Sequence, residues 1–283
     1  MDITSEMIKK LRDKTGAGMM DCKRALESTG GDMDAAIEHL RKKGAAIGQK
    51  RSDRATKEGV IITRVGSNAK TGVVVEVNCE TDFVGRSEDF IGFGQAVAEA
   101  IEVNRPKTLD AIPALANSAG KKIADLMNDV LAKVAEKVDI RRFEILEAAN
   151  GIVSSYTHLG NRIGVLVELE GIASGTPVAR DVAMQIAAMN PAVVMREQVD
   201  KVWIERELDI YRTQAKNEGK PAQIQEKIAQ GKLEKFYQEV VLTEQTFIKD
   251  PGKTINDVLR EANPAQPVII RRFTRFHLGE ETR

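Results

Sequence analysis

The hydrophobic pattern changes period along the chain, and each change indicates a different kind of element. Between residues 4 and 43, apolar residues recur every three or four positions in three groups, which is the spacing of amphipathic helices. These groups are separated or ended by glycines, namely Gly16, Gly18, Gly30, Gly31 and Gly44. The first segment is therefore predicted to be a bundle of three short helices that ends at Gly44.

From residue 59 the apolar residues form short β-branched runs instead. Two such runs, at 60–62 and 73–77, are joined by a turn at 66–72 and predict an antiparallel hairpin. Downstream of this hairpin the spacing predicts three helices and a further strand, at about residues 88–102, 108–119, 121–137 and 140–146.

The same order of elements then recurs. A second hairpin is predicted from 152–158 and 164–169, and a helix from 178–189. The run Gly-Val-Leu-Val-Glu that begins at Gly164 is similar to the run Gly-Val-Val-Val-Glu that begins at Gly72. The run Ile-Arg-Arg-Phe occurs at both 140–143 and 270–273. The repetition predicts an α+β fold with a duplicated core of antiparallel sheets.

Residues 197–240 interrupt the second unit. They carry two apolar stripes at helical spacing, with Gly219 and Pro221 between them. This pattern predicts an antiparallel helical hairpin, or coiled coil, that protrudes as an arm. The alternative is that the arm folds back on the core. The predicted domains are residues 1–55 with three helices and a linker, 56–148, 149–196 with 241–283, and the inserted arm 197–240.

Asp82 and Phe83 occupy the connection between a predicted strand and a predicted helix. Such connections lie on the surface and often carry function. The ring could fill an apolar pocket on a partner, while the carboxylate could compete for the surroundings of a cation. The alternative is that Asp82 caps a turn and Phe83 packs into the core, as most apolar residues do.

Met19 and Met20 are adjacent in the second predicted helix. Adjacent helical residues cannot both point inward, so one methionine is expected to face solvent as a flexible contact for a partner. The alternative is that both are half-buried packing residues.

The composition of the chain limits the kinds of partner that it is expected to bind. The 283 residues predict at least two domains, and lysine plus arginine equals aspartate plus glutamate at 42 each. A neutral chain has no overall field to attract nucleic acid, so direct nucleic-acid binding is not expected. The basic residues within 41–57 form a local positive stretch in this neutral chain. No aromatic residues lie among them to stack on bases. No apolar run reaches the roughly 20 residues of a membrane span, so no membrane is expected.

The candidate chemistry is sparse. Cys22 and Cys79 are the only cysteines and, with three histidines, they give no metal-ligand spacing, so no metal is predicted. The thiols and the absence of a signal-peptide pattern at the start indicate a cytoplasmic location. Cys79 and His158 hold comparable places in the two units, but no third group orients such a pair. With no phosphate-binding loop and no nucleophile elbow, the chain is predicted not to be an enzyme.

Three motifs carry a resemblance to the bacterial elongation factor Ts family, and the resemblance covers the whole chain. They are Thr-Gly-Ala-Gly-Met-Met-Asp-Cys-Lys at 15–23, Val-Asn-Cys-Glu-Thr-Asp-Phe-Val at 77–84, and His158 followed by Asn-Arg-Ile-Gly-Val-Leu-Val at 161–167. The resemblance implies a UBA-like N-terminal domain and guanine-nucleotide exchange on elongation factor Tu. No cofactor of its own is implied, because such a protein acts on the GDP and Mg²⁺ bound to its partner.

The resemblance also implies roles for particular residues. The loop of Thr81, Asp82, Phe83 and Val84 would enter the nucleotide-binding domain of the GTPase and dislodge Mg²⁺. Further contacts with the partner are implied for Leu11, Met19, Met20, Lys23, Val134, Ala135, His158 and Ile248. In the family the position of Ala135 is often glycine, and the position of Lys249 is apolar. Self-association through the helical arm occurs in some members.

Two other functions remain as alternatives. The chain could be an adaptor that binds proteins through its N-terminal bundle without any effect on nucleotide. It could also be a ribosome- or RNA-associated protein that uses residues 41–57, although its neutral total charge counts against this.

Overall fold

The structure is a computed structural model that describes residues 3–51 and 53–281. Residues 1–2, 52 and 282–283, which belong to the predicted domains 1–55 and 241–283, lie outside the described residues. The chain begins with α1 (Ser5–Thr15), α2 (Met19–Ser28) and α3 (Met33–Lys50). These helices bury one small core formed by Ile8, Leu11, Ala17, Cys22, Ala25, Leu26, Ala36 and Leu40. The predicted three-helix bundle is confirmed.

The third helix does not end at Gly44 as predicted; it continues to Lys50. A Cβ atom at position 44 would lie 2.3 Å from the carbonyl oxygen of Asn128, in a helix of the core. Glycine at this position therefore allows two helices to approach closely rather than ending one of them. The linker predicted within residues 1–55 is correspondingly shorter, because it begins only after Lys50.

The first unit of the core is a three-stranded antiparallel sheet of order β1-β2-β3. It comprises β1 (Glu58–Val65), β2 (Thr71–Cys79) and β3 (Asp139–Glu147), with the short helix α4 (Asp82–Gly85) after β2. The helices α5 (Glu88–Asn104) and α6 (Ile123–Val134) cover its outer face. The helix predicted at 108–119 is wrong. Only the 3₁₀ turn Leu109–Ala114 forms, and it contains Pro113, which cannot continue a regular helix.

The second unit repeats this plan with a sheet of order β4-β5-β8. Its strands are β4 (Ile152–Thr157), β5 (Ile163–Glu170) and β8 (Ile269–His277), and its helices are α7 (Pro177–Met189) and α10 (Ile255–Ala262). The small hairpin of β6 (Thr246–Phe247) and β7 (Asp250–Thr254) and the helix α10 were not predicted, because these elements are short. The predicted α+β class with a duplicated core is confirmed.

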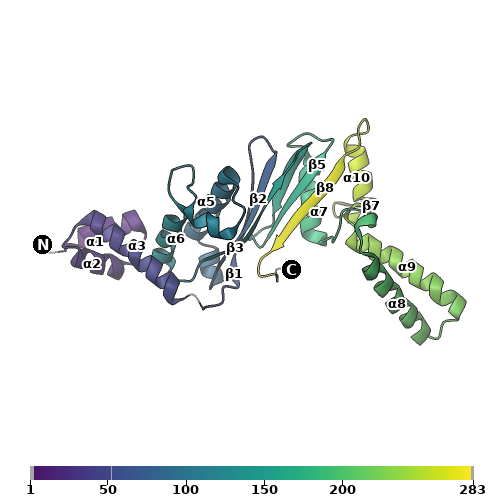
Figure 1. Ribbon diagram of the computed structural model, residues 1–283, viewed down its shortest axis with the longest axis horizontal. Helices are drawn as coiled ribbons and strands as arrows, with labels where there is room; N and C mark the ends of the chain where they lie inside the picture. The colour runs from purple at the N-terminus through teal and green to yellow at the C-terminus, as the bar shows by residue number, and fades with distance from the viewer. Residues whose placement is uncertain (1–2, 52, 282–283) are drawn as a thin grey trace.

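The two sheets pack face to face, with the helices of each unit on the outside (Figure 1). Gly72 of the first sheet and Gly164 of the second lie at this interface. A Cβ on Gly72 would be 2.6 Å from Cγ1 of Val153, and a Cβ on Gly164 would be 2.5 Å from Cγ2 of Ile61. The repeated glycine therefore lets the sheets approach each other, and the two contacts are equivalent in the two units.

Each unit also buries a glutamate opposite an arginine. Glu76 is fully buried, and the Nε of Arg142 and the Nη1 of Arg141 lie 2.6 Å and 2.9 Å from its carboxylate oxygens. Burial acts to raise the pKa of the Glu76 carboxyl, but the N–H of Gly279 and the two guanidiniums outweigh it and lower the pKa. In the second unit Glu168 faces Arg272 at 2.9 Å.

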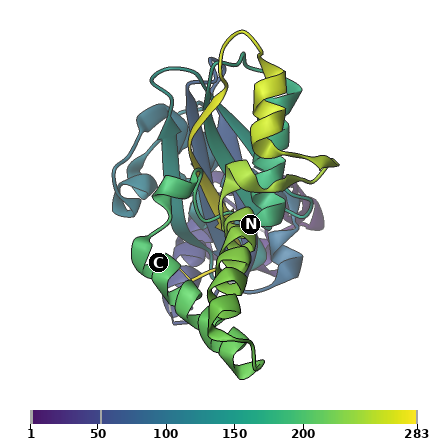
Figure 2. The ribbon, with the colours of Figure 1, turned by 90° about the vertical axis from the view of Figure 1, so that its right-hand side faces the viewer.

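The inserted segment forms the predicted antiparallel helical hairpin, α8 (Lys201–Asn217) and α9 (Ala222–Val240). It projects from the core at the end opposite the bundle (Figures 1 and 2), so the alternative in which it folds back is wrong. The hairpin has its own apolar cluster, in which Trp203 packs edge-on against Phe236 with ring centroids 4.9 Å apart. At its base, Arg196 binds the carboxylates of Glu234 and Glu244.

Candidate functional site

The connection after β2 forms the helix α4, and Phe83 projects from it. The Thr81 hydroxyl caps this helix by accepting a hydrogen bond from the Val84 N–H. The Phe83 side chain is 84% exposed, so the alternative in which it packs into the core is wrong. Asp82 is not the cap; it makes an ion pair of 2.9 Å with Arg86 in the same turn. Val84 packs against the core of the first unit and holds α4 against the sheet.

A second carboxylate holds the base of α4. Glu136, just after α6, accepts hydrogen bonds from the backbone N–H groups of Glu80 and Thr81, at 3.2 Å and 3.0 Å. It also accepts the Thr81 hydroxyl proton at 2.7 Å. In return, Glu80 accepts a hydrogen bond from the N–H of Lys137 at 2.7 Å. We call this reciprocal arrangement the Glu80–Glu136 pair. Nothing in the sequence singled out these two acids among 42.

Glu80 also connects the site to the chain that follows the N-terminal bundle. Its two oxygens accept hydrogen bonds from Arg51 at 2.7 Å and from Arg54 at 2.9 Å. Burial acts to raise the pKa of the Glu80 carboxyl, but the Lys137 N–H and the two guanidiniums lower the pKa to about 2. Glu80 is therefore ionised throughout the neutral range, and part of the basic stretch 41–57 is engaged within the protein.

The candidate contact residues Val134 and Ala135 lie next to Glu136 and therefore close to the base of α4. Val134 is the last residue of α6 and is half-buried, whereas Ala135 is exposed. Ala135 ends the helix in the left-handed conformation, with φ of 53°. This conformation explains why glycine suits the position, since a Cβ is disfavoured there.

Replacing Ala135 with glycine is expected to raise the free energy of unfolding by about 1 kcal/mol, because it relieves the left-handed strain. Chemical denaturation measures the change. The control is Ala132→Gly inside α6, which should lower the free energy of unfolding by about 1 kcal/mol or more. Equal losses in both variants would contradict the explanation.

The N-terminal candidates divide into exposed and buried residues. Met19 and Met20, in the first turn of α2, are 52% and 61% exposed, so both side chains reach the surface. Both methionines thus meet the expectation made for one of them, and the alternative in which both are half-buried is wrong. Lys23 is also accessible, and its Nζ lies 3.8 Å from Oε1 of Glu27. Leu11 differs from the implied role, because it is fully buried in the bundle core and presents no side chain to a partner.

The remaining candidates lie on the second unit. His158 is on the turn between β4 and β5, with Nδ1 3.1 Å from the Tyr156 hydroxyl. The neighbouring Leu159 is 89% exposed and was missed from the sequence, although an apolar residue before a Gly-Asn turn is a usable signal. Ile248 is 37% exposed at the β6–β7 turn. Lys249 binds Asp181 at 2.6 Å, so its amine has a structural partner.

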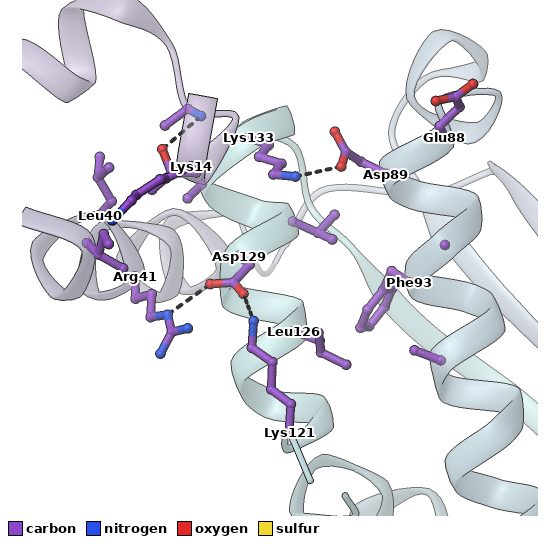
Figure 3. A pocket seen from close by; sticks show the side chains of 17 residues that line it. Lys14, Leu40, Arg41, Glu88, Asp89, Phe93, Lys121, Leu126, Asp129 and Lys133 are labelled. Carbon is purple, nitrogen blue, oxygen red and sulfur yellow. Dashed lines mark hydrogen bonds and ion pairs between the residues drawn. The ribbon is translucent and has the colours of Figure 1, made fainter. Parts of the chain in front are cut away.

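The bundle packs on α6 through α3, and a cleft of about 620 Å³ lies between the bundle, α5 and α6 (Figure 3). Charged pairs span or flank this cleft. Arg41 of α3 and Lys121 both bind Asp129 of α6, and Lys133 binds Asp89 of α5 at 2.6 Å. These lysine and arginine side chains are therefore paired with carboxylates, which leaves them poorly suited to an anionic ligand.

The environment of Cys79 does not favour a reactive thiol. Cys79 is buried, and its Sγ donates to the Thr81 carbonyl oxygen at 3.1 Å rather than contacting His158. Burial, followed by the charge of Glu136, raises the pKa of the Cys79 thiol to about 12, so the thiolate form is disfavoured. Within residues 3–51 and 53–281, no group of three or more potential metal ligands is found, and no helix is long and apolar enough to cross a membrane.

The candidate site therefore presents exposed apolar side chains, including Phe83, Leu159 and Ile248, and these favour a role in binding another protein. A family model described as elongation factor TS matches residues 80–280. The chain is 45% identical to the elongation factor Ts of Prosthecochloris aestuarii over 98% of this chain and 99% of that protein. It is 44% identical to that of Chloroherpeton thalassium over 99% of both chains. It is 43% identical to that of Clostridium perfringens over 98% of this chain and 93% of the relative.

The chain belongs to the elongation factor Ts family, and its role lies in translation elongation.

Proposed function

We propose that the protein is a guanine-nucleotide exchange factor for elongation factor Tu. The helix α4 with Thr81, Asp82, Phe83 and Val84 would enter the nucleotide-binding domain, dislodge Mg²⁺ and promote release of GDP. The observation that carries this proposal is the 84% exposure of Phe83 on a turn whose base is held by hydrogen bonds. An exposed phenyl ring beside a carboxylate can enter a partner without any cofactor of its own.

The energetics agree with this role. Exchange is reciprocal, so a factor that weakens GDP binding tenfold is itself weakened tenfold by GDP, which corresponds to about 1.4 kcal/mol. Mg²⁺ bridges the phosphates and the GTPase, and its loss removes a large electrostatic contribution to nucleotide binding. Insertion of α4 into the GTPase costs free energy, so the factor must also bind the GTPase through residues outside α4. Exposed residues for this purpose are available along the molecule: Met19, Met20, Lys23, Ala135, His158 and Ile248.

The test is the release of fluorescent GDP from purified elongation factor Tu in a stopped-flow instrument. The protein should accelerate release at micromolar concentration, and excess Mg²⁺ should reduce the acceleration. Binding without acceleration would instead favour the adaptor function, for which the exposed Met19 and Met20 are the supporting observation. The proposed partner is a cytoplasmic translation factor, so we propose the same compartment for this protein.

We further propose that the helical arm contributes to self-association. Its apolar cluster is separate from the clusters of the two units, and Val202, Ile210 and Ile224 remain exposed on it. Exposed apolar residues on a projecting hairpin suit contact with a second copy.

Replacing residues 201–238 with a short Gly-Ser linker should leave the core folded. The Val240 carbonyl, which accepts from the N–H groups of Ala192 and Val193, is retained in this variant. The variant should unfold cooperatively. Light scattering should give an assembly with fewer copies of the chain than the full protein forms. A core that fails to fold would show that it depends on the arm. An unchanged number of copies would contradict the role in assembly.

A further inference from the structure

The exposed tip of α4 has few restraints of its own. Phe83 is almost fully exposed, and the ion pair of Asp82 is with Arg86 in the same turn. The direction of the phenyl ring is therefore determined by how the two ends of α4 are held. Its C-terminal end is seated on β1, where a Cβ on Gly85 would lie 3.3 Å from the Gly59 carbonyl oxygen. Its N-terminal end is held by the Glu80–Glu136 pair.

Glu136 determines the direction of the capping hydroxyl. A threonine hydroxyl has one proton to donate, and Thr81 donates it to Glu136 at 2.7 Å. Its lone pairs then face the N–H of Val84, which is the capping contact of α4. The same carboxylate holds the two N–H groups that precede the helix. One side chain thus sets both the position and the orientation of the first turn.

The Glu80–Glu136 pair also lies where two long helices end. The helix α3 ends at Lys50, and Arg51 immediately binds Glu80 at 2.7 Å. The helix α6 ends at Val134, two residues before Glu136. The two helices pack against each other at Gly44. The bundle, through Arg51, and the first unit, through Glu136, therefore both hold the base of α4.

We propose that Glu80 and Glu136 are positioning residues for nucleotide exchange, which hold Phe83 in the orientation that enters the partner. This inference rests on the proposed exchange function. Neither side chain needs to touch the partner, because Glu136 holds the N–H groups of residues 80 and 81, and Glu80 holds the Lys137 N–H beside Glu136. Their removal should therefore reduce the rate of stimulated GDP release more than it weakens association with the GTPase.

The test compares two substitutions at one position. Glu136→Ala removes all three hydrogen bonds and should slow stimulated GDP release at least tenfold, with association to nucleotide-free elongation factor Tu changed by less than about threefold. Glu136→Gln should recover most of the rate. Its amide oxygen can accept from both N–H groups, and its amide NH₂ can donate to the Thr81 hydroxyl oxygen. A merely structural role would not separate rate from affinity in this way.

Two controls make the result specific. Glu147→Ala removes a carboxylate of the same unit that pairs with Arg105 at 2.9 Å, away from α4, and should leave the rate unchanged. Glu136→Ala combined with Phe83→Ala should be no slower than Phe83→Ala alone, because both changes act on one tip.

The outcomes separate the two proposals. If the unaltered protein does not accelerate GDP release, the exchange function fails. If it does, and Phe83→Ala is impaired while Glu136→Ala keeps the full rate, the positioning role is overturned. Equal losses of rate and affinity in Glu136→Ala also overturn it. Should Glu136→Ala fail to fold, Thr81→Val decides, because it removes only the two contacts of the hydroxyl, with Glu136 and with the Val84 N–H, and should slow release without weakening association.

Discussion

Phe83→Ala is expected to slow the stimulated release of GDP by roughly 30-fold, without loss of stability. Aromatic anchors at the centre of interfaces typically contribute about 2 kcal/mol or more, which corresponds to this factor. Phe83 is 84% exposed, so its truncation creates no cavity, and the free energy of unfolding should change by less than about 0.5 kcal/mol. Stopped-flow release and chemical denaturation measure the two quantities.

Val103→Ala is the matched control for Phe83→Ala. Val103 is also a strongly exposed apolar residue of the first unit, at 68%, but it lies near the C-terminal end of α5 and outside the candidate site. Its replacement should change neither GDP release nor stability. If Phe83→Ala lowered the stability by the 3–5 kcal/mol typical of a core phenylalanine, the ring would be a packing residue and the proposed insertion would fail.

Glu76→Ala is expected to lower the free energy of unfolding by about 3–5 kcal/mol, the largest loss of stability predicted here. The substitution leaves the guanidiniums of Arg141 and Arg142 without the buried carboxylate that accepts their hydrogen bonds. It also removes the hydrogen-bond acceptor of the Gly279 N–H, so the segment after β8 loses an attachment. Chemical denaturation followed by circular dichroism measures the loss.

Glu168→Ala, at the equivalent position of the second unit, provides the comparison. Glu168 pairs with Arg272, whose side chain is 56% exposed and can be solvated when the carboxylate is removed. The loss should therefore be clearly smaller than for Glu76→Ala. Equal losses would indicate that the number and burial of the arginine partners do not govern the stability of these sites.

Periodicity predicted most of the fold, and its errors have identifiable causes. A glycine can end a helix or allow a neighbour to approach, and the sequence around Gly44 does not distinguish these uses. The helix predicted at 108–119 does not form, because Pro113 interrupts an apolar spacing that is otherwise helical. The β6–β7 hairpin and α10 are too short for a periodic pattern to develop.

The candidate site was less accessible to sequence reasoning. The residues alone left two interpretations of Phe83 open, and family resemblance favoured the one that the exposure of the ring supports. At Leu11 the opposite holds, because the resemblance implied a contact with the partner, whereas the side chain is fully buried in the bundle core. Glu80 and Glu136 could not be found, since their pairing joins positions far apart in the chain.

The paired glycines at the sheet interface bear on how this chain arose. Gly72 faces Val153, and Gly164 faces Ile61, so exchanging the two units reproduces the same contact. A contact of this kind is isologous, which is the geometry of a twofold homodimer. A gene for one unit would have produced a protein whose copies paired through this face, and its duplication and fusion would turn that dimer into one chain. Once fused, the halves could diverge, one acquiring the exposed α4 and the other the helical arm.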